Sequence, residues 1–206
     1  MPGWIVPLRE LVVTGAAAVG AVVAVLGLDA WKRQLKGQAE YDLAKRVLRL
    51  LYQYRDAIDA FRNPAMWNYE MPEPPEEEAA GMTPDQIRYY GRQKAYQARW
   101  SRIRDVRAEL YPELLEAEVL WDDELNALLK PIWKLENDLY FAVQDDLEVS
   151  KPGVVPDEVE HMTGRDESKR RRRLLYARYG DEDIFAGEFQ AGMKPLEAFL
   201  KKRLKS

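Results

Sequence analysis

An all-α fold with one N-terminal transmembrane helix is predicted by three features of this 206-residue sequence. Residues 11–28 read LVVTGAAAVGAVVAVLGL and carry no charge. In the rest of the chain, apolar residues recur every three or four positions, which is the spacing of one face of an α-helix. No segment of useful length alternates between apolar and polar residues as a strand would. We expect the membrane helix to continue into a long cytoplasmic helix that packs with antiparallel helices as a bundle.

The uncharged run just reaches the length of a membrane span, which needs roughly 20 mostly apolar residues and at least about 17. Trp4 and Trp31 flank it, where aromatic side chains with a polar group would meet the two headgroup layers. At about 1.5 Å per residue, these tryptophans are roughly 40 Å apart, the thickness of a bilayer with its interfaces. A cleaved signal peptide and a buried hairpin helix are the alternatives. A signal peptide is disfavoured because its apolar core usually has about 7 to 15 residues.

Basic residues predict the orientation of the span, because they concentrate on its cytoplasmic side. Lys32, Arg33 and Lys36 follow the apolar run, whereas only Arg9 precedes it. We therefore expect the N-terminus outside and the rest of the chain in the cytoplasm, at a bacterial inner (cytoplasmic) membrane. The predicted domains are an anchor with its flanks, residues 1–36, and a cytoplasmic helical domain, residues 37–206. A linker is expected at about 64–82 and a loop at about 149–165.

The first helix of the cytoplasmic domain is predicted from an apolar stripe that runs from Leu43 to Phe61. Asn63-Pro64 ends it, since proline disfavours the helical conformation of the residue before it. Residues 72–78, PEPPEEE, predict an extended linker, because prolines lack a backbone donor and the glutamates repel one another.

Thr83 begins the next helix as its N-cap, with Gln86 completing a capping box. We expect this helix to end near Tyr111, and Pro112 to start another that Pro131 kinks or restarts. Residues 85–110 hold seven basic residues, and residues 113–148 hold eleven acidic ones. The two segments are therefore predicted to form either an antiparallel hairpin or one kinked rod. A short basic helix at about 166–179 and a last helix at about 195–204 follow.

Three segments of the chain are LAKRVLRLLYQYRDAIDAFRNPAMWNYEMPEPPEEE (43–78), ARWSRIRDVRAELYPELLEAEVLW (98–121) and PLEAFLKKRL (195–204). They resemble segments of a group of uncharacterised bacterial proteins. Those proteins are single-pass membrane proteins with a charged helical cytoplasmic region. The resemblance implies this architecture and a bacterial origin, and it carries no site residues to this chain.

The composition offers few residues that could act in catalysis or bind a metal ion. The chain has no cysteine and a single histidine, His161, which excludes disulfides, thiol nucleophiles and multi-histidine sites. Glu158 and His161 have the Glu-x-x-His spacing of di-iron bundles, but such sites need two of these motifs and two further glutamates. We therefore expect no enzyme activity, no metal and no cofactor.

Two clusters are candidates for interaction. Small residues on one face of the span allow two helices to approach closely, although such residues are common in membrane helices; they are Ala16, Gly20 and Ala24. The second cluster is a basic run that could bind anionic lipid or nucleic acid, or pair with the acidic helix of the same chain; it comprises Lys169, Arg170, Arg171, Arg172 and Arg173.

The function predicted from these features is a membrane-anchored interaction or scaffold protein. Its expected partners are membrane lipid and either a partner protein or further copies of the chain, and a nucleic-acid partner is disfavoured. The alternative is an oligomeric effector that perturbs the membrane when its cytoplasmic domain is triggered.

Overall fold

The computed structural model describes residues 5–177 and 183–205, and of residues 5–22, 25, 156 and 158 it describes the backbone alone. All regular secondary structure in these residues is helical, and none of them lies in a strand. The all-α prediction is therefore confirmed. The chain divides into two compact units, one of residues 1–42 and the other of residues 43–205, and each is described by itself.

The described part of the first unit belongs to α1, which spans Ile5–Phe61 and includes the predicted anchor. Large apolar side chains on this part of α1 are exposed; they are Val23, Leu26, Leu28, Trp31 and Leu35. Close to the boundary with the second unit, Lys36 forms an ion pair with Glu40 at 3.8 Å.

In the described part of the chain, no helix combines the length and the apolar character needed to cross a bilayer.

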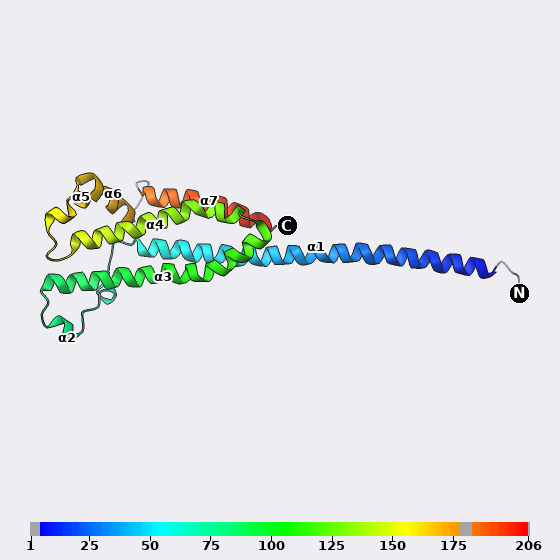
Figure 1. Cartoon of the computed structure of the whole chain (residues 1–206), viewed down its shortest axis with the longest axis horizontal. Helices are drawn as coiled ribbons and strands as arrows, with labels where there is room; N and C mark the ends of the chain where they lie inside the picture. The colour runs from blue at the N-terminus through cyan, green and yellow to red at the C-terminus, as the bar shows by residue number, and fades with distance from the viewer. Residues whose placement is uncertain (1–4, 178–182, 206) are drawn as a thin grey trace. The chain divides into compact units, whose positions relative to one another are not determined.

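The second unit is a helical bundle. Its long elements are residues 43–61 of α1, α3 (Pro84–Trp121), α4 (Glu124–Ser150) and α7 (Ile184–Arg203), which lie side by side in Figure 1. Side chains from all four form one apolar core. The stripe predicted from Leu43 to Phe61 faces this core, because Leu43, Val47, Leu51, Tyr54 and Ile58 are fully buried.

Short elements connect the long helices. η1 (Asn68–Glu70) and α2 (Glu76–Ala79) lie in the predicted linker, between α1 and α3. The expectation that residues 72–78 are extended throughout is wrong, because Glu76, Glu77 and Glu78 form the first turn of α2, where acidic side chains are favourable. η2 (Pro156–Val159), α5 (Glu160–Thr163) and the basic helix α6 (Arg165–Leu175) follow α4. The N-cap of α3 is as predicted: the Thr83 hydroxyl accepts a hydrogen bond from Gln86 N–H, and the Gln86 side chain accepts one from Thr83 N–H.

The expectation that Pro112 separates two helices is wrong. α3 continues through Pro112 to Trp121, and the chain reverses only at Asp122, whose φ is 52°. Leu110 and Ala117 are buried on either side of the proline, so packing holds this stretch helical despite the missing backbone donor. Pro131 lies inside α4 in the same way. Of the two predicted arrangements, α3 and α4 adopt the antiparallel hairpin (Figure 1). The turn lies at Asp122 and not at Pro112 as expected.

The last helix also differs from the prediction, since α7 begins at Ile184 and not near Pro195. Phe185, Phe189 and Met193 extend its buried stripe toward the N-terminus. A Cβ on Gly192 would lie 2.8 Å from Cδ1 of Ile132. A glycine at this position therefore lets α7 pack closely against α4.

Candidate functional site

The predicted basic run lies on α6, and its members have different surroundings. Arg171 is buried; its Nη1 donates to the Met162 carbonyl at 2.9 Å, and its Nε lies 3.5 Å from the Asp146 carboxylate of α4. Arg170 pairs at 3.6 Å with Glu167 of the same helix. The remaining members, Lys169, Arg172 and Arg173, are exposed. One of the five cations thus contacts the acidic helix, and the other four face solvent.

The other sequence-predicted residues belong to the N-terminal unit. Ala24, Trp31, Lys32 and Arg33 are exposed on α1. The side chain of Ala16 and the surroundings of Gly20 lie outside what the structure describes, as does the whole of Trp4. Elsewhere, His161 is exposed on α5, and no group of residues suited to hold a metal ion occurs in the described part of the chain.

A buried tyrosine and glutamate connect α1 to α4. The Tyr54 hydroxyl donates to Glu136 at 2.5 Å, and Arg107 of α3 pairs with the same carboxylate at 3.0 Å. Burial raises the pKa of Tyr54, and the charge of Glu136 raises it further, so the hydroxyl keeps its proton and remains a donor. The guanidinium of Arg107 also lies 4.2 Å from the centre of the Trp133 ring. These contacts satisfy a carboxylate that would otherwise destabilise the core.

Arg62, directly after α1, has 1% of its surface exposed and is the most deeply buried charged residue among those that the structure describes in the bundle. Its Nε donates to the Leu174 carbonyl at 2.7 Å. Its Nη2 donates to the carbonyls of Arg173 at 3.0 Å and Tyr176 at 3.2 Å, and to Asp183 at 2.9 Å. We call this set the Arg62 clamp. It joins the end of α1 to the end of α6 and the residue before α7.

A cation suits this position. The last carbonyls of a helix lack partners within the helix and carry partial negative charge, and Arg62 binds those of α6. Its guanidinium carbon also lies 4.2 Å from the centre of the Phe185 ring. The backbone adds a further link, since Ala177 N–H donates to the Arg62 carbonyl at 2.8 Å.

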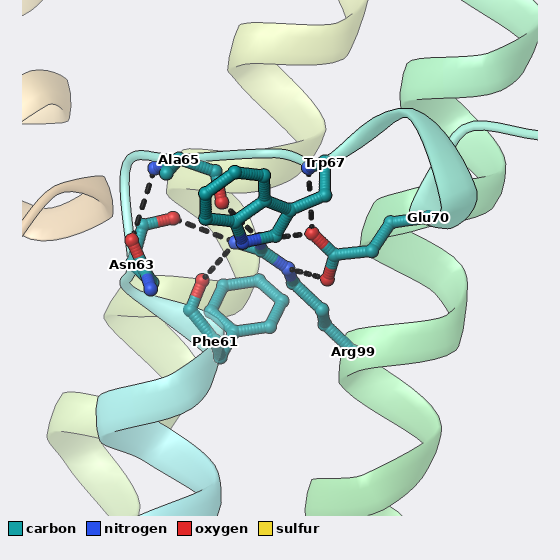
Figure 2. Close-up of polar contacts among 6 residues, drawn as sticks. All are labelled: Phe61, Asn63, Ala65, Trp67, Glu70 and Arg99. Carbon is teal, nitrogen blue, oxygen red and sulfur yellow. Dashed lines mark hydrogen bonds and ion pairs between the residues drawn. The ribbon is translucent and has the colours of Figure 1, made fainter.

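A second buried arginine, Arg99 of α3, organises the loop that follows α1. Figure 2 shows its guanidinium surrounded by loop acceptors. It donates to the carbonyls of Phe61 at 3.3 Å, Asn63 at 2.6 Å and Ala65 at 2.6 Å, and to both carboxylate oxygens of Glu70 at 2.9 and 2.8 Å. We call this set the Arg99 clamp. All five donor hydrogens of the guanidinium face these acceptors, which fixes the path of the loop.

The Arg99 clamp positions two exposed aromatic residues. Trp67 N–H donates to the Glu70 carboxylate at 3.0 Å (Figure 2), so the backbone at Trp67 is fixed through Glu70. The side chains of Trp67 and Tyr69 nevertheless remain 58% and 82% exposed. Hydrogen bonds from Arg99 lower the pKa of Glu70, which keeps this carboxylate charged. The loop is thus ordered by a buried ion pair and displays a tryptophan and a tyrosine to solvent.

No protein-family model matches this chain, and no curated protein or solved structure is significantly similar to it.

Neither clamp was predicted from the sequence, although each arginine interrupts an apolar pattern. Arg99 lies three residues after Tyr96 and four before Ile103, so it belongs to the buried face of α3. Arg62 stands four residues after Ile58, where the stripe of α1 would continue. A cation at a position of the apolar stripe was therefore the only indication of each clamp in the sequence. Such a residue must find hydrogen-bond acceptors when the helix packs.

Proposed function

We propose that this protein is a single-pass membrane protein of the bacterial inner membrane whose cytoplasmic helical domain binds protein partners and has no catalytic activity. The observation that carries the proposal is the uncharged run 11–28 within α1. Val23, Leu26 and Leu28 in this run are exposed, as is Trp31 just after it. Apolar side chains exposed together on one helix favour a lipid or protein environment. The exposed cations Lys32 and Arg33 support the cytoplasmic side for the residues that follow.

The interaction role is supported by the loop that the Arg99 clamp holds. Binding hot spots are enriched in tryptophan and tyrosine. A loop ordered before binding loses less conformational entropy when a partner docks, so its contacts contribute more to affinity. Trp67 and Tyr69 meet both conditions, because they are exposed aromatic residues on a segment fixed by hydrogen bonds from the buried Arg99.

The membrane part is tested with the full chain expressed in bacteria. Wild-type protein should remain in the membrane fraction after a carbonate wash. Changing Val19 and Val22 to arginine should release much of it, because each arginine near the centre of a span costs about 2.5–3.5 kcal/mol. The matched control, Leu35→Arg, lies outside the uncharged run and should stay in the membrane. Release of the wild type, or equal retention of all three proteins, would contradict the anchor.

Orientation is tested separately. A reporter that is active only outside the cytoplasm, fused after Ser206, should be silent, whereas the same reporter fused before Met1 should be active. Activity of the fusion after Ser206 would place the helical domain on the opposite side.

A further inference from the structure

The loop that carries Trp67 and Tyr69 is the centre of a surface that combines a projecting side chain with hollows beside it. Tyr69 borders two surface hollows of about 530 and 540 Å³. The first is lined from α3 by Lys94, Gln97 and Arg102, among other residues. The second is lined by the loop and by Ile87 and Gly91 of α3. Each hollow is large enough to receive an aromatic side chain that projects as Tyr69 does.

The same surface carries both signs of charge. Its basic arm is Arg102 and Arg104, which are exposed on α3, with Lys94 beside them. Its acidic arm is Glu73 together with the exposed glutamates of α2, Glu76, Glu77 and Glu78. Within the described residues, none of these side chains has an opposite charge at ion-pair distance, so the two arms do not neutralise each other in one copy of the chain.

We propose that this surface binds a second copy of the chain around a two-fold axis. Tyr69 of each copy would enter a hollow beside Tyr69 of the other, with Trp67 packed at the centre. The acidic arm of each copy would face the basic arm of its partner. A two-fold interface requires a patch that is complementary to itself, and this patch holds both a projection and hollows, and both charges.

Two features favour a second copy over a nucleic acid. Glu73 lines the second hollow beside Tyr69, and the three glutamates of α2 follow it in the chain, so the surface would repel a phosphate backbone. The formal net charge of the chain is −4, and nucleic-acid-binding domains are commonly basic. A second copy instead supplies both the cations for the acidic arm and the carboxylates for the basic arm.

The inference deepens the interaction role proposed above by naming the partner and the surface, and it does not require the membrane anchor. It also differs from association through Ala16, Gly20 and Ala24, which would use the membrane helix. The experiment therefore uses the full chain in mild non-ionic detergent, and membrane retention is measured separately.

The test is a charge exchange between the two arms. Variant A carries Arg102→Glu and Arg104→Glu, and variant B carries Glu76→Lys and Glu77→Lys. Light scattering on wild-type protein should give a dimer that dissociates at high salt, because salt screens exposed ion pairs. Variants A and B should each self-associate at least tenfold more weakly. An equimolar mixture should recover dimers, since each arm then again meets the opposite charge.

Tyr69→Ala gives an independent measure and should weaken the dimer at least tenfold with an unchanged circular dichroism spectrum. Lys130→Glu, which alters a charge outside the patch, is the matched control and should dimerise as wild type does. A monomeric wild type would overturn the proposal. So would a dimer that variants A and B leave intact, or one that only Gly20→Ile disrupts. Recovery of dimers in the mixture, but not in either variant alone, would establish the reciprocal interface.

Discussion

The two arginine clamps are built alike and differ in what they hold. Arg62 and Arg99 are both buried, and each binds three backbone carbonyls and one carboxylate. The carboxylate that Arg62 binds is buried, since Asp183 has only 7% of its side chain exposed. Arg99 fastens a loop whose aromatic side chains remain exposed.

The Arg62 clamp therefore joins elements of the bundle to one another, whereas the Arg99 clamp fixes a loop on the surface. A loop that only had to connect α1 to α3 could be short and polar, as most connections between helices are. Instead, a buried guanidinium is used to order a loop with an exposed tryptophan and tyrosine. The comparison thus supports an interaction role for the loop that carries Trp67 and Tyr69, and a purely structural role for the Arg62 clamp.

The largest expected effect is on stability at Arg62. Arg62→Met should lower the free energy of unfolding by about 3–5 kcal/mol, because it leaves the Asp183 carboxylate buried without this guanidinium. Urea unfolding of the full chain in detergent, followed by circular dichroism, measures the change. Arg55→Met, on the exposed side of the same helix, is the control and should change stability by less than about 0.5 kcal/mol. Similar losses for both variants would contradict the clamp.

Removing Arg99 should cost less stability and disturb the loop more. Arg99→Met should destabilise by about 2–4 kcal/mol, since Glu70 is more exposed than Asp183 and can be hydrated. The freed loop should be cut faster by a protease specific for aromatic residues, at Trp67 or Tyr69. Arg102→Met on the exposed face of α3 should leave the cleavage rate unchanged. An uncut loop in Arg99→Met would show that other contacts order it.

The pH dependence of stability tests whether the Glu70 carboxylate stabilises the fold through Arg99. Because its folded pKa is lowered by Arg99, Glu70 stabilises the fold above the ordinary glutamate pKa of about 4.3, and this contribution is lost as pH falls through the folded value. Glu70→Gln should be about 1–2 kcal/mol less stable at pH 7 and lose less on acidification to about pH 3. Thermal unfolding of both proteins at several pH values measures this. Glu77→Gln, outside the clamp, should follow the wild-type profile, and an equal profile for Glu70→Gln would refute the assignment.

The smallest expected change in stability is at Trp67. Trp67→Ala should alter the free energy of unfolding by at most about 0.5 kcal/mol, because the side chain is exposed and the clamp uses only its backbone N–H. Self-association measured on the same sample should nevertheless fall. A loss of stability comparable to that of Arg99→Met would mean that the indole supports the loop and is not free for a partner.

Much of the helical pattern could be predicted from sequence, because it depends on local spacing. The stripe from Leu43 to Phe61 and the capping box at Thr83 follow from residues close in the chain. The turn at Asp122 could not be predicted, since Pro112 is a strong local helix breaker and only packing of Leu110 and Ala117 overrides it. The start of α7 was missed because Gly187, Gly192 and Pro195 obscure a stripe that begins at Phe185.

The clamps were harder to predict for a different reason. Their acceptors are mostly backbone carbonyls, which every residue carries, so the sequence does not identify the partner of Arg99 or Arg62. The basic run was recognisable from composition alone, but its one buried member, Arg171, became apparent only from the packing of α6 against α4.

The Arg62 clamp also has a kinetic consequence. Its carbonyl and carboxylate partners lie 111 to 121 residues further along the chain, whereas α3 and α4 meet through a turn of adjacent residues. Closing so long a loop costs entropy before any contact offsets it, so the helical hairpin should assemble first and the clamp last. Contacts that form after the transition state mainly slow unfolding. We therefore expect the Arg62 clamp to slow the unfolding of the bundle, and so to set the lifetime of the folded state.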